Sequence, residues 1–331
     1  MCIGCGVVLK VTTFIALCSC SLTAIASWIS DEQAIMGTSV SAEFWCDDEQ
    51  RGRQLMAQVM DDMRAVDAQL SPYIESSELY RVNRDAAVEP VVVSNDFFQL
   101  LQKSLYYSRI SQGAFDITFA SVGFLYNYRE GIAPDDVALK KHLPAINYHH
   151  LHLDEKNHTI FFDHPDVKID LGGIAKGWAV DRSIEILKRA GVTSAIVTAG
   201  GDSRILGDRR GTPWMIGIRH PRKPDAYAVR LPLQDSAIST SGDYERYFFE
   251  GELRIHHIID PSSGRSADQV ESATILAPLA VDSDALSTTV FVLGVERGLA
   301  LVNRMPGVDA IIIDGHTRMH YSEGLLRAGP Q

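Results

Sequence analysis

The stretch whose residue types are best suited to catalysis or ligand binding is KIDLGGIAKGWAVD (168–181). In it, two acids and two lysines accompany three glycines. Glycines that precede a helix leave backbone N–H groups free to approach phosphate oxygens, and Lys176 can neutralise the phosphate charge. The spacing fits neither a Walker loop nor the GxGxxG dinucleotide fingerprint. A tight turn that requires glycine for its geometry alone is an equally good interpretation of this segment.

A second group of chemically capable residues lies in DSDALSTTVFVLG (282–294). Asp284 and Thr288 are four residues apart, so they share one face of the helix that the apolar spacing predicts. A carboxylate beside a hydroxyl suits a hard cation such as Mg²⁺, which prefers oxygen ligands. Taken alone, an acid near the start of a helix more often complements the helix dipole.

Two shorter motifs add a base and an aromatic ring. In LRIHHIIDPSSG (253–264), the adjacent His256 and His257 would point to opposite faces of a strand, so only one can enter a given pocket. Such a histidine could act as a general base, although a lone strand histidine is more often a satisfied polar residue. In GAFDIT, Phe115 beside Asp116 suits a ring with hydrogen-bonding edges, or equally a core residue followed by a turn cap.

Helical and extended patterns indicate which elements must position these residues. The predicted helices are 48–70, a second from Ser94 or Asn95 to about Gly113, Ala179–Arg189 ended by Gly191, and a fourth from Asp282 or Ser283 to about Arg304. The predicted strands are 39–44, Val167–Leu171, LHL and TIFF around the turn DEKN, PWMIGIRH, YAVRLPL, and YFFEGELRIHHII turning at Glu250-Gly251. Since helices mix with meandering strands, the pattern predicts an α+β fold with mainly antiparallel sheet.

The first 26 residues form a short apolar run in which Lys10 is the one charge, which predicts an export signal. Cleavage could follow the small-residue sequence AIA that ends at Ala26, or Cys20 could be acylated in the lipobox-like sequence LCSC. We favour the second alternative. It predicts a periplasmic protein, 27–331 being the folded domain, anchored to a bacterial membrane through a lipid on Cys20.

The composition of the full chain is that of an ordinary globular protein. The 331 residues are 46% hydrophobic and 22% charged, enough to bury a large core. The formal charge of −11 is interrupted by no run of Lys or Arg, which excludes nucleic acid as a partner. Four of the five cysteines lie in the leader, so Cys46 is left without an internal disulfide partner.

Together and in this order, the motifs resemble those of the ApbE family, the bacterial FAD:protein FMN transferases. The blocks that carry the resemblance are AIMGTSVSAEF, LSPYIESSELYRVN, GAFDIT, DLGGIAKGWAVD, TAGGDSRILG, AISTSGDYERY, HIIDPSSG and DALSTTVFVLG. They span nearly all of the chain after the leader. The resemblance implies an α+β fold and a Mg²⁺-dependent transfer of FMN from FAD to a Thr or Ser hydroxyl of an exported protein, with release of AMP.

The resemblance also implies roles for single residues. Asp284, Thr288 and the backbone carbonyl of Gly173 would hold the metal, which makes Asp284 a catalytic residue, and His257 would accept a proton. The positions that match flavin-nucleotide contacts are Met36, Tyr73, Ala114, Phe115, Asp116, Asp170, Lys176 and Ile258. The implied acceptors are flavoprotein subunits of membrane redox complexes.

Two alternative functions remain open at this point. A hydrolase of the same fold would split FAD into FMN and AMP without an acceptor, and faster turnover without acceptor would indicate it. An exported flavin carrier would bind FAD tightly and release no AMP. A serine hydrolase is disfavoured, because the sequence has no GxSxG motif.

Overall fold

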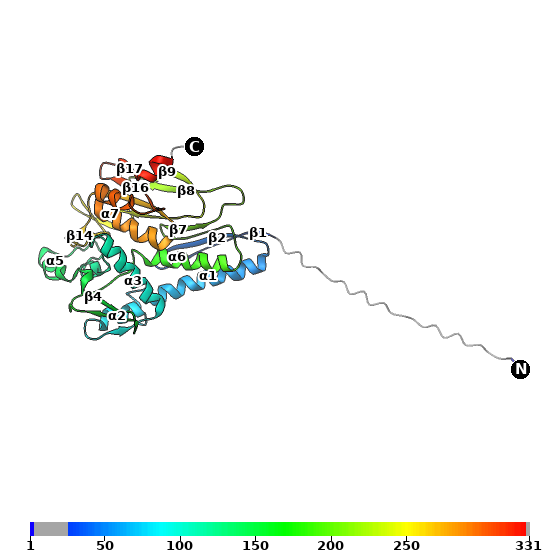
Figure 1. Ribbon diagram of the computed structural model, residues 1–331, viewed down its shortest axis with the longest axis horizontal. Helices are drawn as coiled ribbons and strands as arrows, with labels where there is room; N and C mark the ends of the chain where they lie inside the picture. Colours follow the sequence, from blue (N-terminus) through cyan, green and yellow to red (C-terminus); the bar gives the residue numbers. More distant parts are fainter. Residues whose placement is uncertain (3–25, 329–331) are drawn as a thin grey trace.

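The computed structural model describes residues 1–2 and 26–328, in which helices pack on a large antiparallel sheet (Figure 1). Eight strands form the sheet, and all neighbouring pairs are antiparallel. In spatial order the strands are β1 (Ser27–Ile35), β2 (Thr38–Cys46), β6 (Ala195–Ala199), β7 (Asp202–Leu206), β10 (Ala237–Gly242), β15 (Val270–Ala277), β16 (Asp309–Asp314) and β17 (Met319–Tyr321). This is the α+β architecture that the sequence predicts.

One face of the sheet is covered by three long helices, with α6 between the other two (Figure 1). They are α1 (Glu49–Leu70), α6 (Ala175–Arg189) and α7 (Ala280–Val302). The opposite face is covered by the hairpin of β8 (Trp214–His220) and β9 (Lys223–Leu233), which packs on Ile238 and Leu276. The main core therefore lies between the helices and the sheet.

The chain between α1 and α6 forms a lobe of helices and short strands at the lower left of Figure 1. They are α2 (Glu78–Asp85), β3 (Val91–Val92), α3 (Asn95–Ile110), η1 (Ile117–Phe119), α4 (Ala120–Gly123), α5 (Asp136–His142), η2 (Leu143–Ala145), η3 (Tyr148–His150), β4 (Leu151–Asp154) and β5 (Thr159–Phe162). The other short elements are β11 (Tyr247–Glu250), β12 (Leu253–His256), β13 (Ile259–Asp260), β14 (Arg265–Ser266) and α8 (Glu323–Ala328). Contacts between α3 and α7 join the lobe to the helical layer.

Helices and hairpins with local sequence signals form as predicted. Asp48 caps α1 by accepting a hydrogen bond from the N–H of Arg51, and Ser94 caps α3 in the same way. The apolar stripe of α1 is buried, with Val59 and Met63 fully enclosed. The predicted hairpins are present as β4–β5, β8–β9 and β11–β12.

The strand predicted at Val167–Leu171 is wrong. The segment is irregular, and other groups satisfy its backbone. The N–H of Ile169 donates to Oδ1 of Asn83, and its carbonyl accepts from Nδ2 of the same residue, at 2.7 and 2.8 Å. The N–H of Lys168 donates to the hydroxyl of Ser121 at 3.0 Å. Because these backbone groups are already bonded, the segment pairs with no strand.

The helix predicted at Ala179–Arg189 begins earlier, at Ala175. Gly177 therefore lies in the first turn of α6 and not in the turn that precedes it. Gly172 and Gly173 remain in that turn, as predicted. The start shifts because the N–H of Gly177 finds an acceptor on α7, which the apolar spacing of α6 cannot indicate.

The N-terminal cap predicted for α7 is also wrong, because the helix begins at Ala280 and not after Asp282 or Ser283. The carboxylate of Asp181, on α6, accepts hydrogen bonds from the N–H groups of Ala280 and Val281, both at 2.9 Å. The capping group thus comes from a different helix. No local pattern in the α7 sequence could reveal it.

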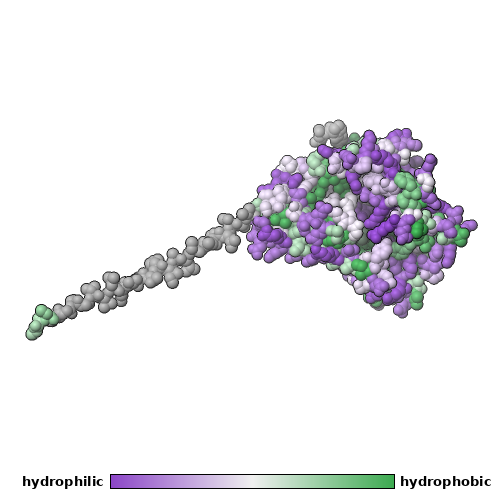
Figure 2. Space-filling view, turned by 180° about the vertical axis from the view of Figure 1, so that it is seen from behind, coloured by the Kyte–Doolittle hydropathy of each residue, from purple (hydrophilic) through white to green (hydrophobic). Residues whose placement is uncertain are grey.

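Among the helices of the described residues, α7 is long and apolar enough to cross a membrane by length and composition, yet it is largely buried in the core. The face drawn in Figure 2 is mainly hydrophilic, with small hydrophobic patches. The predicted export signal falls almost entirely on residues 3–25, which lie outside the described residues.

Candidate functional site

The candidate site begins where α6 and α7 cross, and Gly177 makes this crossing close. A Cβ atom at Gly177 would lie 2.2 Å from the carbonyl oxygen of Ala280 and 2.8 Å from Cβ of Asp284, so a larger residue would push the helices apart. With glycine in place, the N–H of Gly177 donates to Oδ2 of Asp284 at 2.9 Å. The crossing thereby orients the Asp284 carboxylate.

Asp284 belongs to a buried cluster of one lysine and two carboxylates. Lys176, on α6, donates to Asp202 at the start of β7, and its Nζ lies 3.5 Å from Oδ1 of Asp284. Burial, and then the charge of Asp202, raises the pKa of Asp284 to about 7. Burial alone would lower the pKa of Lys176, but the two carboxylates outweigh it and raise that pKa. With both acids ionised the cluster carries a net negative charge, which a second cation would neutralise.

The three residues expected to hold a metal lie together. Thr288 is one turn after Asp284 on α7. Its Oγ1 lies 3.3 Å from the point where a Cβ atom would stand if Gly173 had a side chain, so the hydroxyl is next to the Gly173 backbone. A carboxylate, a hydroxyl and the adjacent backbone form an oxygen donor set that fits Mg²⁺. Within residues 1–2 and 26–328, no group of three or more His, Cys, Asp or Glu side chains is suited to a metal. A cation here would therefore take its other ligands from water or substrate.

The two adjacent histidines have different environments. Both ring nitrogens of His256 are bonded, because Nε2 donates to the carbonyl of Ala267 at 2.6 Å and Nδ1 accepts from the N–H of Ile258 at 3.3 Å. Nδ1 of His257 is buried and has no hydrogen-bond partner among the described residues. Burial, then the proximity of His256 and Arg246, lowers the pKa of His257 to about 3, so the ring is neutral. His257 therefore has a free acceptor nitrogen, whereas His256 is structural and Ile258 is a core residue.

Phe115 lies beside the glycine-rich turn, and Asp116 follows it in the chain. Cε2 of Phe115 is 3.5 Å from the position of a Cβ on Gly173. Asp116 caps η1, and its carboxylate accepts hydrogen bonds from the N–H and the hydroxyl of Thr118 and from one further backbone N–H. Burial raises the pKa of Asp116. Of the two interpretations of this acid, the geometry favours the turn cap, while Phe115 faces the site.

The remaining predicted positions gather around Arg246, which the motifs did not single out. Gly37 follows Met36 in the β1–β2 turn. The guanidinium of Arg246 lies 3.8 Å from the point where a Cβ atom on Gly37 would stand. Burial raises the pKa of Asp170, and the charge of Arg246 partly offsets this. Burial of the phenol, then the charge of Asp170, raises the pKa of Tyr73, although most of that side chain is exposed. Arg246, Asp170 and Tyr73 therefore form a group of charged and aromatic side chains at the edge of the candidate site.

Asp202 and Arg246 are the two site residues that the sequence reasoning missed. Asp202 follows two glycines in TAGGDSRILG, and a turn placed just before an acid is a signal that could have pointed to it. Arg246 lies in DYERY, where nothing local separates it from a surface arginine. It is exposed and forms no ion pair within the described part of the chain.

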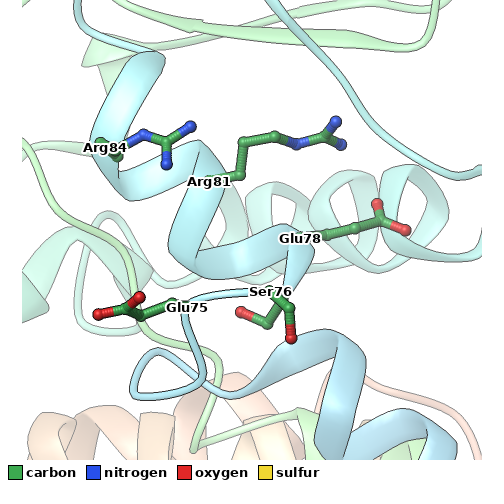
Figure 3. Close-up of a pocket in the computed structure, with 6 residues that line it drawn as sticks. Glu75, Ser76, Glu78, Arg81 and Arg84 are labelled. Carbon is green, nitrogen blue, oxygen red and sulfur yellow. The ribbon is translucent and has the colours of Figure 1, made fainter.

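A cavity of about 350 Å³ beside α2 does not belong to this site. Its lining residues are Glu75, Ser76, Ser77, Glu78, Arg81 and Arg84, and Figure 3 shows the two arginines extending from α2 in the same direction. Arg81 already donates to the carbonyl of Val92, and Arg84 is paired with Asp85. Because both guanidinium groups are already bonded, the cavity is a poor anion site.

The chain is similar in sequence to known proteins. The sequence profile of the ApbE family matches residues 36–312. A protein of Treponema pallidum (strain Nichols) named FAD:protein FMN transferase is 35% identical over 278 residues, which cover 78% of this chain and 76% of that protein. A Vibrio cholerae protein of the same name is 34% identical over 254 residues, covering 74% of this chain and 75% of that protein.

Solved structures show the same fold. The crystal structure of the ApbE protein from Thermotoga maritima has a TM-score of 0.84 and 32% identity, and the match covers 92% of this chain and 100% of that chain. The flavin transferase ApbE from Vibrio cholerae has a TM-score of 0.81 and 28% identity, with 92% and 99% covered. The predicted α+β fold and the predicted family are both confirmed.

Proposed function

Because the chain belongs to the ApbE family, we propose that it transfers FMN from FAD to a Thr or Ser hydroxyl of an exported flavoprotein subunit. The hydroxyl oxygen bonds to the phosphorus of the FMN half, the pyrophosphate bond breaks and AMP leaves. The product is a flavin joined to the acceptor through a phosphoester. The observation that carries the proposal is the buried Lys176–Asp202–Asp284 cluster beside Gly173, which lies inside the family match.

In this proposal His257 accepts the proton of the attacking hydroxyl. Its ring is neutral at physiological pH, and its Nδ1 has no competing partner among residues 26–328. His256 is unsuited to the same task because both of its ring nitrogens are bonded. The role therefore belongs to one histidine of the pair.

We propose Mg²⁺ as the cofactor, held by Asp284, Thr288 and the backbone of Gly173. When bound, Mg²⁺ would neutralise negative charge on the pyrophosphate. Lys176 forms ion pairs with Asp202 and Asp284. These two carboxylates already neutralise its charge, so it is not the group that binds a phosphate. Arg246 is exposed and unpaired within the described residues, and its guanidinium suits contact with a phosphate of FAD.

The proposed place of action is outside the cytoplasm, in the periplasm. The apolar leader supports export, and a lipid on Cys20 would hold the protein at a membrane. Replacing Cys20 by Ala should then release the protein from membranes into the soluble fraction. A native product whose N-terminus is Ser27 would instead show that the protein is exported without the lipid.

The enzymatic proposal is tested by incubating the protein with FAD, Mg²⁺ and a peptide that carries the DGxTGAT-like target implied by the family. The peptide should gain the mass of FMN on its Thr, and AMP should appear in equal amount. Chelation with EDTA should stop the reaction, and added Mg²⁺ should restore it. Free FMN beside an unmodified peptide would identify a hydrolase, and bound FAD without AMP would identify a flavin carrier.

A further inference from the structure

The β11–β12 hairpin is a two-stranded ribbon whose base lies in the candidate site. Neither strand joins another sheet in the described part of the chain. β11 follows Arg246 directly, and β12 is followed directly by His257. The N–H of His257 donates to the carbonyl of Arg246 at 3.1 Å, which closes the base of the ribbon.

The register shows which backbone groups of β11 face away from β12. Antiparallel pairs alternate between hydrogen-bonded and non-hydrogen-bonded, and Arg246–His257 is hydrogen-bonded. Tyr247–His256 and Phe249–Arg254 are therefore non-hydrogen-bonded pairs. The N–H and C=O groups of Tyr247 and Phe249 must point outward, along the free edge of β11.

Part of the remaining boundary of the hairpin is occupied. On the outer edge of β12, the N–H of His256 donates to the hydroxyl of Ser266, which in turn donates to the carbonyl of His256, at 2.9 and 2.6 Å. On one face, Phe248 packs against Tyr128 with ring centroids 6.0 Å apart. The edge of β11 is open to another chain along both Tyr247 and Phe249, whereas β12 is covered at His256, the end nearest the candidate site.

The open face beside this edge is aromatic. Tyr247 is 40% exposed and Phe249 is 57% exposed. The guanidinium of Arg254 lies over both rings, 4.4 and 5.3 Å from their centroids. Exposed aromatic side chains next to unpaired strand groups are typical of sites that bind a peptide as an added strand.

We propose that an extended segment of the acceptor polypeptide pairs with the free edge of β11. This inference rests on the proposed function, since it names how the protein substrate is held. Backbone bonds to Tyr247 and Phe249 give affinity that tolerates different sequences, and their rings contact alternate side chains of the segment. Phe249 is three residues from Arg246, about 10 Å along the strand. A short acceptor segment therefore reaches from the aromatic face to the base beside His257.

Comparing proline with alanine at position 249 distinguishes the contribution of strand pairing from that of the Phe249 ring. Because Phe249 is in a non-hydrogen-bonded pair, proline removes only an outward N–H and spares the ladder with β12. F249P should raise the KM for the DGxTGAT peptide about tenfold, with kcat and FAD affinity close to wild type. F249A, which keeps the N–H, should raise the KM less. The matched control M215A removes a similarly exposed apolar side chain from β8 and should leave the KM unchanged.

Hydrogen exchange on the wild type provides a second measurement that does not depend on any variant. The peptide should slow exchange at the amides of Tyr247 and Phe249. A wild-type KM for F249P, or unchanged exchange at these amides in the presence of saturating peptide, would overturn the strand pairing while leaving the transferase intact. A wild type that binds FAD and modifies no peptide would overturn the proposed function, and this inference with it.

Discussion

Replacing Asp284 by Asn should stabilise the metal-free protein and abolish transfer. The Asn side chain keeps an oxygen that can accept from the N–H of Gly177, and it lacks the negative charge that Asp284 acquires at high pH. Lys176 then retains Asp202 as its single anionic partner, so the buried cluster becomes neutral. Greater stability combined with lost chemistry is typical of a residue that is kept for function.

The size of the stability gain follows from the pKa of Asp284, which burial raises from 3.8 to about 7. Each pKa unit corresponds to about 1.4 kcal/mol, so ionising this group opposes folding by up to about 4 kcal/mol above pH 7. Between these two pKa values the folded state binds more protons than the unfolded state. The free energy of unfolding of the wild type should therefore fall as pH rises through this window. The Asn variant lacks this contribution.

Urea unfolding in EDTA, at about pH 4, pH 6 and pH 8, measures the difference between Asp284→Asn and the wild type. The difference should be close to zero at the lowest pH and reach about 2 to 4 kcal/mol in favour of the variant at the highest. Added Mg²⁺ should stabilise the wild type and leave the variant unchanged. A variant less stable than the wild type at pH 8, or a difference that does not vary with pH, would refute the reasoning.

Four other substitutions test separate contacts. His257→Ala should lose transfer and keep FAD binding, whereas His256→Ala should mainly lower the melting temperature; equal losses of transfer would reject the assignment. Because the pKa of His257 is about 3, this ring should not reduce the wild-type rate between about pH 7 and pH 5. Gly177→Ala should lower the free energy of unfolding by about 2 to 3 kcal/mol, since its Cβ would meet Ala280, and wild-type stability would contradict the close crossing. Asp181→Ala should cost about 2 to 4 kcal/mol in the same measurement, because it leaves two helix N–H groups unbonded.

The elements that could be predicted from the sequence are those whose signals are local. α1 has its cap at Asp48 and its apolar stripe within one continuous segment, and the hairpins have their turns between their own strands. The errors occur where the deciding partner is distant. Asn83 takes the backbone bonds that would have made Val167–Leu171 a strand, and Asp181 caps a helix that begins far along the chain.

The same distinction applies to the candidate site. Asp284 and Thr288 could be paired from their spacing on one helix, and the family resemblance supplied Gly173, which the fold brings beside Thr288. Asp202 acquires its role only when β7 lies against the start of α6, and Arg246 only when its loop meets the β1–β2 turn. The residues next to Asp202 and Arg246 in the sequence give no indication of these long-range contacts.

The order of strands in the large sheet has a consequence for how the chain acquires its fold. β2 pairs with β6, so this contact joins two strands that are separated in sequence by the whole segment from α1 to α6. Pairing over such a separation is slow, because the entropy of closing the loop is lost before the contacts form. Until then the β1–β2 hairpin has an open edge and exposes Val40 and Phe44, which are fully buried in the finished protein. During synthesis, the unpaired edge of β2 therefore remains prone to aggregation until more than half of the 331 residues have been made.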